Sequence, residues 1–162
     1  MREMFNKGDQ IVYPIHGPGT IESIEDKEID GVSRRYYLLR IHQNNIHIKV
    51  PCDAALVLGV RSIIKKSEIS KVNRTLGAAT GEIAQIWNRR YRDNMDKLKT
   101  GSIMHVAEVV RDLMRSDNEK KLSTGEKKML TNAKQILIEE LRLASGKGAE
   151  ELNLLIEKEV MA

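Results

Sequence analysis

The sequence predicts an α+β protein in which a small antiparallel β-barrel of the Tudor or SH3 type precedes an all-α helical bundle. Two observations support this fold class. Apolar residues alternate with polar residues in short segments of the first third of the chain, and from residue 62 they recur at helical spacing. Because strands and helices do not alternate along the chain, a Rossmann-type sheet is excluded. We expect two domains, residues 1–62 and residues 63–162.

The expected strands are short and antiparallel, and they cover residues 10–14, 20–29, 33–41 and 46–50. Between the first two, the His-Gly-Pro-Gly cluster at residues 16–19 should break the strand. Asp30-Gly31 is a strong signal for a tight hairpin, and residues 44–45 predict a second turn. In the last strand apolar and polar side chains alternate: Ile46, Ile48 and Val50 against His47 and Lys49.

Helical spacing begins after residue 62. The first helix is expected to end at Gly77 and to carry the apolar residues Ile63, Ile64, Ile69, Val72 and Leu76. A second helix is expected between about residues 88 and 98, where Tyr91, Met95 and Leu98 form a narrow apolar stripe.

Two further helices have recognisable starts. Ser102 is a good N-cap for a helix whose buried face comprises Ile103, Val106, Val110 and Leu113. Ser123 and Glu126 have the spacing of a capping box, so a long helix should run from there to about Ala144. Its inner face would comprise Met129, Leu130, Ala133, Ile136, Leu137 and Leu141. A break at residues 145–148 precedes a short last helix.

The composition of the 162-residue chain excludes several classes of protein. No run of about 18 apolar residues occurs, and the first residues contain no apolar signal region, so we expect a soluble, cytoplasmic protein. The single cysteine, Cys52, cannot form an internal disulfide, and a buried, unreactive thiol is expected there.

No pattern typical of an enzyme is present. The histidines are scattered, and no HExxH, GxSxG or paired-cysteine spacing places a base beside a nucleophile or gathers metal ligands. His42 and His47 flank the second turn, but a metal site there would need a third ligand. We therefore expect no catalytic residues, no metal and no cofactor.

The net charge of +4 comes from one segment of the chain. Residues 1–70 carry 10 basic and 9 acidic side chains, residues 71–99 carry 7 and 3, and residues 100–162 carry 10 and 11. On the second helix, positions 89, 92, 96 and 99 share a face away from the apolar stripe. Such a face can contact a phosphate backbone, or it can simply lie in solvent.

Trp87, the only tryptophan, comes directly before the arginines of this helix. If the helix continues upstream of Asn88, Trp87 joins the stripe with Tyr91 and is a core residue. If Asn88 is the N-cap, Trp87 lies at N′, where Arg92 at N4 offers it no apolar partner. An indole in that position is suited to wedge into a stacked base step. Both interpretations are open at this point.

Four blocks of sequence resemble the bacterial CarD/CdnL family of transcription regulators. They are FNKGDQIVYPIHGPGTI, the VP pair at Val50-Pro51, IWNRRYRDNMDKLKTGS and AEVVRDLMRSDNEKKLSTGEKKMLTNAKQILIEEL, within about residues 4–145. The resemblance implies a Tudor-like domain that binds the β subunit of bacterial RNA polymerase, a module shared with the transcription-repair coupling factor. It also implies a helical domain that contacts promoter DNA at the upstream edge of the transcription bubble, in a nucleoid-associated protein. Residues 146–162 receive no role and would be a variable tail.

The resemblance also implies DNA-binding residues. Trp87 matches the tryptophan of the family pattern W-[SN]-R-R-Y, which inserts into the minor groove where the duplex opens. Arg89, Arg90 and Arg92 match the basic positions beside it and would contact the DNA backbone.

Polymerase-binding residues follow from the same resemblance. Lys27 and Lys49 fall where basic residues of the family face the β subunit, with Ile29 close by. Both are lysines where the family often has arginine, and a lysine cannot form the forked contact with a carboxylate.

The predicted function is that of a transcription regulator without catalysis of its own. The β-domain would tether the protein to polymerase, and Trp87 would then stabilise the open promoter complex. The alternative is a protein-interaction adapter that uses the β-domain alone and makes no direct contact with DNA.

Overall fold

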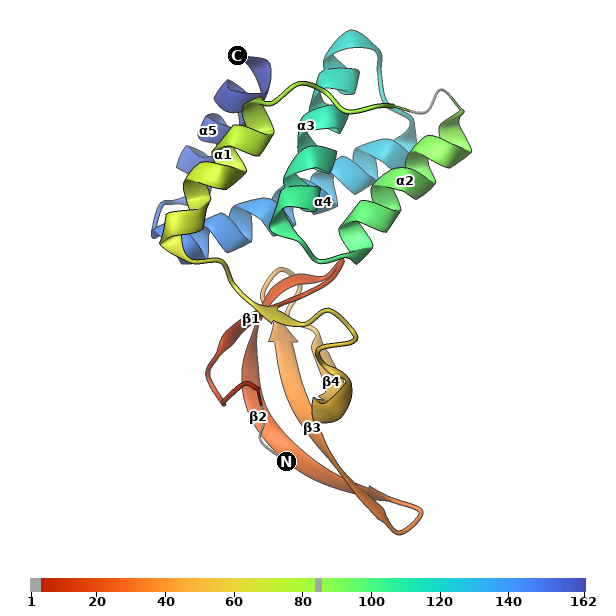
Figure 1. Ribbon diagram of the computed structural model, residues 1–162, viewed down its shortest axis with the longest axis vertical. Coiled ribbons are helices and arrows are strands. Elements are labelled where there is room, and N and C mark those ends of the chain that lie inside the picture. Colours follow the sequence, from red (N-terminus) through yellow and green to blue (C-terminus); the bar gives the residue numbers. More distant parts are fainter. Residues whose placement is uncertain (1–3, 84–85) are drawn as a thin grey trace.

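A five-stranded antiparallel sheet forms the first part of the protein in a computed structural model that describes residues 4–83 and 86–162. The strand order is β4-β3-β2-β1-β5 (Figure 1). The strands are β1 (Gln10–Tyr13), β2 (Gly17–Ile29), β3 (Val32–Ile41), β4 (His47–Pro51) and β5 (Arg61–Ser62). Helices follow this sheet, so the predicted α+β class is confirmed.

The two longest strands, β2 and β3, form a hairpin that projects away from the helices (Figure 1). Its turn is Asp30-Gly31, whose φ angles of 51° and 77° are both positive, as a two-residue type I′ turn requires. Ile29 pairs with Val32 across this turn. The predicted hairpin is therefore confirmed.

The glycine-proline cluster does not break the sheet, contrary to the sequence-based expectation. The chain reverses before it, at Ile15 with φ 72°, and β2 already begins at Gly17, which pairs with Tyr13. Gly19 allows a close approach between strands, because a Cβ atom there would lie 2.7 Å from the carbonyl oxygen of Arg40 on β3. The small residues therefore belong to the strand and let β3 pack close to it.

The sheet has its own hydrophobic core. Its buried members are Phe5, Ile11, Ile21, Tyr37, Leu39, Val50, Ala55 and Val60. The hydroxyl of Tyr37 accepts a hydrogen bond from the backbone N–H of Phe5 at 3.2 Å, and burial raises the pKa of Tyr37. Ile46, expected on the apolar face of the last strand, lies before β4 and is 41% exposed, because pairing with β3 begins only at His47. Cys52 is partly buried beside this core.

The helical bundle is arranged around α3, which packs against α1, α2 and α4. Its helices are α1 (Ile69–Gly77), α2 (Trp87–Lys99), α3 (Ile103–Glu119), α4 (Thr124–Ser145) and α5 (Ala149–Met161). The predicted capping box is confirmed at the start of α4, where the Ser123 hydroxyl accepts a hydrogen bond from the backbone N–H of Glu126 at 3.2 Å. Among the described residues, no helix is long and apolar enough to cross a bilayer.

Two isoleucines expected in the first helix lie outside it. Ile63 and Ile64 follow β5 in an extended segment that continues through Lys65, with φ −79° and ψ 153°. Helical turns begin only with the 3-10 turn Lys66–Glu68 that precedes α1. Ile64 still packs into the core of the bundle, so its apolar character reflects burial rather than helical position.

The last helix is an integral part of the bundle and not a tail. Gly146, with φ 78°, ends α4 in the left-handed conformation, and α5 then packs against α1 and α4. It buries Leu152, Ile156 and Val160 in the helical core.

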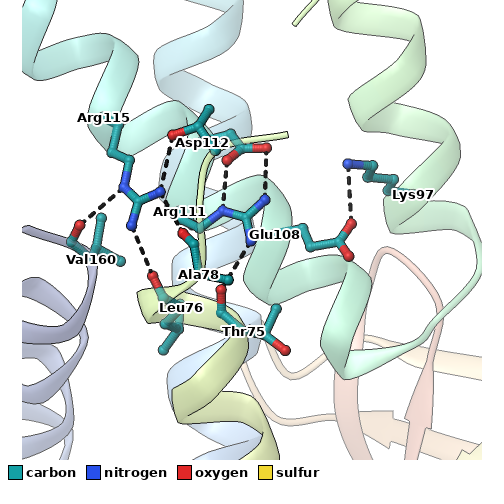
Figure 2. A network of polar contacts seen from close by, with 10 residues as sticks. Thr75, Leu76, Ala78, Lys97, Glu108, Arg111, Asp112, Arg115 and Val160 are labelled. Atoms are coloured by element: carbon teal, nitrogen blue, oxygen red, sulfur yellow. Dashed lines mark hydrogen bonds and ion pairs between the residues drawn. The ribbon is translucent and has the colours of Figure 1, made fainter. Parts of the chain in front are cut away.

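Two arginines of α3 bind the carbonyl groups at the end of α1 (Figure 2). Arg111 donates a hydrogen bond to the carbonyl oxygen of Thr75 at 3.0 Å. Arg115 donates to the carbonyl oxygens of Ala78 at 2.7 Å and of Val160 at 3.0 Å. The last carbonyls of a helix lack partners within the helix, so these contacts satisfy them and tie α1 to α3 and α5.

A buried ion pair joins the sheet to the bundle. Glu140 of α4 is 1% exposed and accepts hydrogen bonds from the Arg61 guanidinium of β5 at 2.6 and 2.8 Å. The backbone N–H of Ile64 donates to the same carboxylate at 2.9 Å. Arg61 also donates to the carbonyl oxygen of Gly101, just after α2, at 2.8 Å. Ile15 adds an apolar contact with the helical core.

Candidate functional site

Trp87 is the first residue of α2, and Asn88 lies inside the helix. The sequence-based alternative that made Asn88 the N-cap is therefore wrong. Ile86 occupies the cap position with extended backbone angles, and its carbonyl oxygen accepts the first helical hydrogen bond from the N–H of Arg90 at 3.0 Å. The preference of asparagine for cap positions is overridden because Trp87 has packing partners when the helix starts one residue earlier.

The indole of Trp87 is held on one side and open on the other. Its ring stacks on Tyr91, with centroids 5.3 Å apart and planes inclined by 23°. Its Nε1–H donates a hydrogen bond to the hydroxyl of Ser123 at 2.8 Å. Gly125 lies beside the ring, because a Cβ atom there would be 3.5 Å from Trp87 Cζ2. The residue nevertheless remains 41% exposed, so it is neither a buried core tryptophan nor an unsupported one.

The three arginines that follow Trp87 have different surroundings. Arg89 and Arg92 are exposed, and neither forms an ion pair with any residue in the described parts of the chain. Arg90 is half-buried, and its Nε and Nη2 donate hydrogen bonds to the two carboxylate oxygens of Glu126 at 2.7 and 3.1 Å. The structure therefore separates Arg90 from Arg89 and Arg92, which helical spacing placed on one face, although the family resemblance implied DNA contacts for all three.

Glu126 is a buried carboxylate with only 2% of its surface exposed. The hydrogen bond from Arg90 lowers the pKa of Glu126, against the opposing effect of burial, and a hydrogen bond from Ser123 lowers it further. Arg90 in turn has a raised pKa because of the same hydrogen bond. The pair is therefore charged in the folded protein and links α2 to α4.

The predicted polymerase-binding residues lie together on one face of the sheet. Lys27 and Ile29 are two residues apart on β2, and Lys27 pairs with Arg34 on β3. Lys49 of β4 reaches the same face, because its ammonium nitrogen lies 3.8 Å from the carboxylate of Glu25. Lys27, Ile29 and Lys49 are all exposed. This outer face of β2, β3 and β4 is separate from the surface around Trp87.

The histidines have structural partners. His42 lies 2.7 Å from the Thr20 hydroxyl and 3.5 Å from Glu139, and His47 lies 3.5 Å from Glu22. No group of three or more His, Cys, Asp or Glu side chains suited to a metal ion occurs within residues 4–83 and 86–162.

Comparison with known proteins accounts for both parts of the fold. Residues 5–64 match the family described as the CarD-like/TRCF RID domain, and residues 71–157 match the family described as CarD, C-terminal domain. This chain belongs to the CarD family of transcription regulators. The putative transcription factor YdeB of Bacillus subtilis (strain 168) is 41% identical over 143 residues, which cover 88% of this chain and 94% of that protein.

A solved CarD structure is also similar in sequence. The NMR structure of the 72-residue N-terminal domain of Myxococcus xanthus CarD is 27% identical, and the match covers 38% of this chain and 83% of that chain with a TM-score of 0.32.

The match to the CarD C-terminal domain extends to residue 157 and so includes most of α5, in agreement with the burial of that helix.

Sequence reasoning missed one contact of Trp87 in this CarD-family protein, the hydrogen bond to Ser123, whereas the contact with Tyr91 was one of its two alternatives. Ser123 and Glu126 were identifiable as a capping box, but no pattern in the sequence indicates that the start of α4 faces the start of α2. Tyr91 was identified as part of the apolar stripe of α2, and its spacing of four residues from Trp87 is the one signal for the stacking contact.

Proposed function

We propose that this protein binds the β subunit of RNA polymerase through the outer face of its sheet and stabilises the open promoter complex through Trp87. In this proposal the indole enters the minor groove at the upstream edge of the bubble. The observation that carries it is the placement of a partly exposed Trp87 at the first residue of α2, with exposed Arg89 and Arg92 within the next turns. At an opened base step the indole can stack on an exposed base, and the neighbouring arginines can contact the phosphates.

Arg89 and Arg92 are the residues that we assign to phosphate contacts, because both are exposed and have no ion-pair partner in the described parts of the chain. The start of α2 supports this assignment, since Ile86 provides no side-chain cap for its first N–H groups. We assign Arg90 first to the contact with Glu126, which already balances its charge. Its contribution to DNA binding would then be indirect.

The mechanism depends on which form of the promoter offers a place for the indole. Separating one base step of an intact duplex costs a few kcal/mol, and at the edge of the bubble this separation has already occurred. Trp87 would therefore bind opened DNA more tightly than closed DNA. A ligand that prefers one of two states shifts the equilibrium toward it, so the open complex would last longer.

The face of the sheet that carries Lys27, Ile29 and Lys49 supports the polymerase contact. Ile29 and Val32 are 51% and 66% exposed at the hairpin tip, and the paired residues Lys27 and Arg34 lie two positions further along the two strands. An apolar centre with a charged rim is the composition of many protein interfaces. Binding there would hold Trp87 near the promoter and raise its effective concentration.

The proposal is tested by the lifetime of the open complex with the variants Trp87→Ala and Lys49→Glu. Trp87→Ala should leave polymerase binding intact and shorten the lifetime by about tenfold, since base–aromatic stacking contributes roughly 1–3 kcal/mol per base. Lys49→Glu should weaken co-purification with polymerase while circular dichroism remains that of the wild type. An unchanged lifetime with folded Trp87→Ala would contradict the assignment of the indole.

Two observations favour the adapter alternative: Trp87 has partners inside the protein, and Arg90 is neutralised by Glu126. Salt distinguishes the two functions. Contact with several phosphates makes affinity for the promoter complex fall steeply as salt is added, whereas an adapter would show little dependence. Titration of salt with wild-type protein and with the double variant Arg89→Ala/Arg92→Ala should show a steeper slope for the wild type, and equal slopes would favour the adapter.

A further inference from the structure

The hydroxyl group of Ser123 uses all of its hydrogen-bonding capacity. It accepts hydrogen bonds from Trp87 Nε1 at 2.8 Å and from the backbone N–H of Glu126 at 3.2 Å, and it donates to the Glu126 carboxylate at 3.1 Å. A serine hydroxyl has one hydrogen to donate and two lone pairs that accept. Because each has a partner, the hydroxyl has one preferred orientation, and the lone pair that faces Trp87 is fixed.

The contacts around Ser123 close into a ring. Glu126 holds the Ser123 hydroxyl and is itself held by the forked contact with Arg90. Arg90 lies on α2 only three residues after Trp87. The chain of contacts therefore begins at the indole of α2, passes through Ser123 and Glu126, and ends at the Arg90 guanidinium of the same helix. Glu126 is 2% exposed, and a buried charge of this kind strongly disfavours any rearrangement that would leave it unpaired.

The hydrogen bond to Ser123 holds the N–H edge of the indole, and packing against neighbouring residues holds one of its faces. Tyr91 stacks on the indole with an inclination of 23° between the two planes. Gly125 lies beside the indole, and a Cβ atom added there would already be in van der Waals contact with Trp87 Cζ2, at 3.5 Å. A side chain larger than glycine would meet both aromatic rings there. One hydrogen bond and two apolar contacts therefore act on one half-exposed side chain.

We infer that Ser123, supported by Glu126 and Arg90, is a positioning residue that holds the Trp87 indole in one orientation before DNA is bound. The inference rests on the proposed function of Trp87 for its purpose. An indole that is already oriented loses less side-chain entropy on binding than one that samples several rotamers. Ser123 would thus have two roles, as the N-cap of α4 and as the acceptor for the indole N–H.

Tryptophan fluorescence tests this inference directly, because Trp87 is the only tryptophan of the chain. The variant Ser123→Ala should increase the fraction of indole that is not docked by about fivefold, the change expected for loss of one hydrogen bond. The increase would be observed in the free protein as faster local depolarisation and stronger quenching by acrylamide. Ser123→Thr keeps the hydroxyl and should restore the wild-type values.

A matched control separates positioning from loss of helix stability. Gly146→Ala places a side chain at φ 78° at the opposite end of α4, where its Cβ would meet no other atom within 4 Å. It should destabilise α4 through backbone strain alone and leave indole fluorescence unchanged. Wild-type fluorescence in Ser123→Ala, or an equal change in Gly146→Ala, would overturn the inference.

The lifetime of the open complex distinguishes this inference from the proposed function. If Ser123→Ala frees the indole and also shortens the lifetime, both are supported. If Ser123→Ala frees the indole while Trp87→Ala leaves the lifetime unchanged, the positioning role of Ser123 stands and the proposed function fails.

Discussion

Neighbouring arginines of α2 have different environments because consecutive residues of a helix point about 100° apart. Arg89 and Arg92 extend into solvent, whereas Arg90 points toward α4 and meets a buried carboxylate. The family resemblance groups all three side chains, whereas helical spacing places only Arg89 and Arg92 on a shared face. At the scale of single residues, the charge available to an anionic partner is therefore smaller than a count of arginines suggests.

The Arg90–Glu126 pair should stabilise the fold in a pH-dependent manner. Glu126→Gln should lower the free energy of unfolding at neutral pH by about 1–3 kcal/mol, because Arg90 loses its charged acceptor. In the folded protein, the hydrogen bond from Arg90 keeps the pKa of Glu126 below its ordinary value of 4.5. A lowered pKa contributes stability above the unfolded-state value, and this contribution is lost as the pH falls through the folded-state value. The difference between wild type and variant should therefore shrink below about pH 4.5, as measured by urea unfolding.

Glu108→Gln provides the control for this experiment. Glu108 pairs with Lys97 at 3.1 Å between α3 and α2, but both side chains are about one-third exposed. An exposed pair contributes roughly 0–1 kcal/mol, so the variant should change the free energy of unfolding little. An equal loss in the two variants at neutral pH would show that burial of Glu126 has no special effect.

At the scale of helices and strands, the sequence predicts those elements whose apolar residues recur with a regular period or whose turns and caps need particular residues. The hairpin at Asp30-Gly31, the apolar face of α3 and the start of α4 were predicted because burial imposes a period of two or 3.6 residues and turns need particular residues. Those signals lie within short stretches of sequence, so they can be recognised without knowledge of the rest of the fold.

Boundaries that depend on distant partners were not predicted. Residues 17–19 belong to β2 because the tight turn before them reverses the chain and β3 packs closely against Gly19. Trp87 begins α2 because Tyr91 and Ser123 hold it there. The exposure of Arg89 follows from helical periodicity, but the pairing of Arg90 with Glu126 joins residues 36 positions apart, which no local pattern contains.

At the scale of the whole molecule, the two candidate binding surfaces lie far apart and are linked through a junction of several contacts between the β-domain and α4, among them the Arg61–Glu140 pair and the contact of His42 with Glu139. The β2–β3 hairpin projects from one end of the protein, and the N-terminal end of α2 lies toward the other (Figure 1). Arg61 connects them, since it pairs with Glu140 of α4 and donates to the carbonyl oxygen of Gly101 at the base of α2. A tether raises the effective concentration of a DNA contact most when the distance that it imposes matches the distance between the two sites.

Weakening this junction at Glu140 should therefore loosen the coupling between the two surfaces without removing either. Glu140→Gln leaves the shape of the side chain but removes the charge that Arg61 and the N–H of Ile64 contact, and loss of one partner of a buried pair costs about 3 kcal/mol. Thermal unfolding should show this loss, whereas Arg142→Ala, which breaks a more exposed pair on the same helix, should change stability by less than about 1 kcal/mol. At a temperature where Glu140→Gln remains folded, polymerase binding should be unchanged and the open-complex lifetime should fall, because Trp87 is then held less firmly at the promoter. A wild-type lifetime in this folded variant would show that the junction contributes to stability alone.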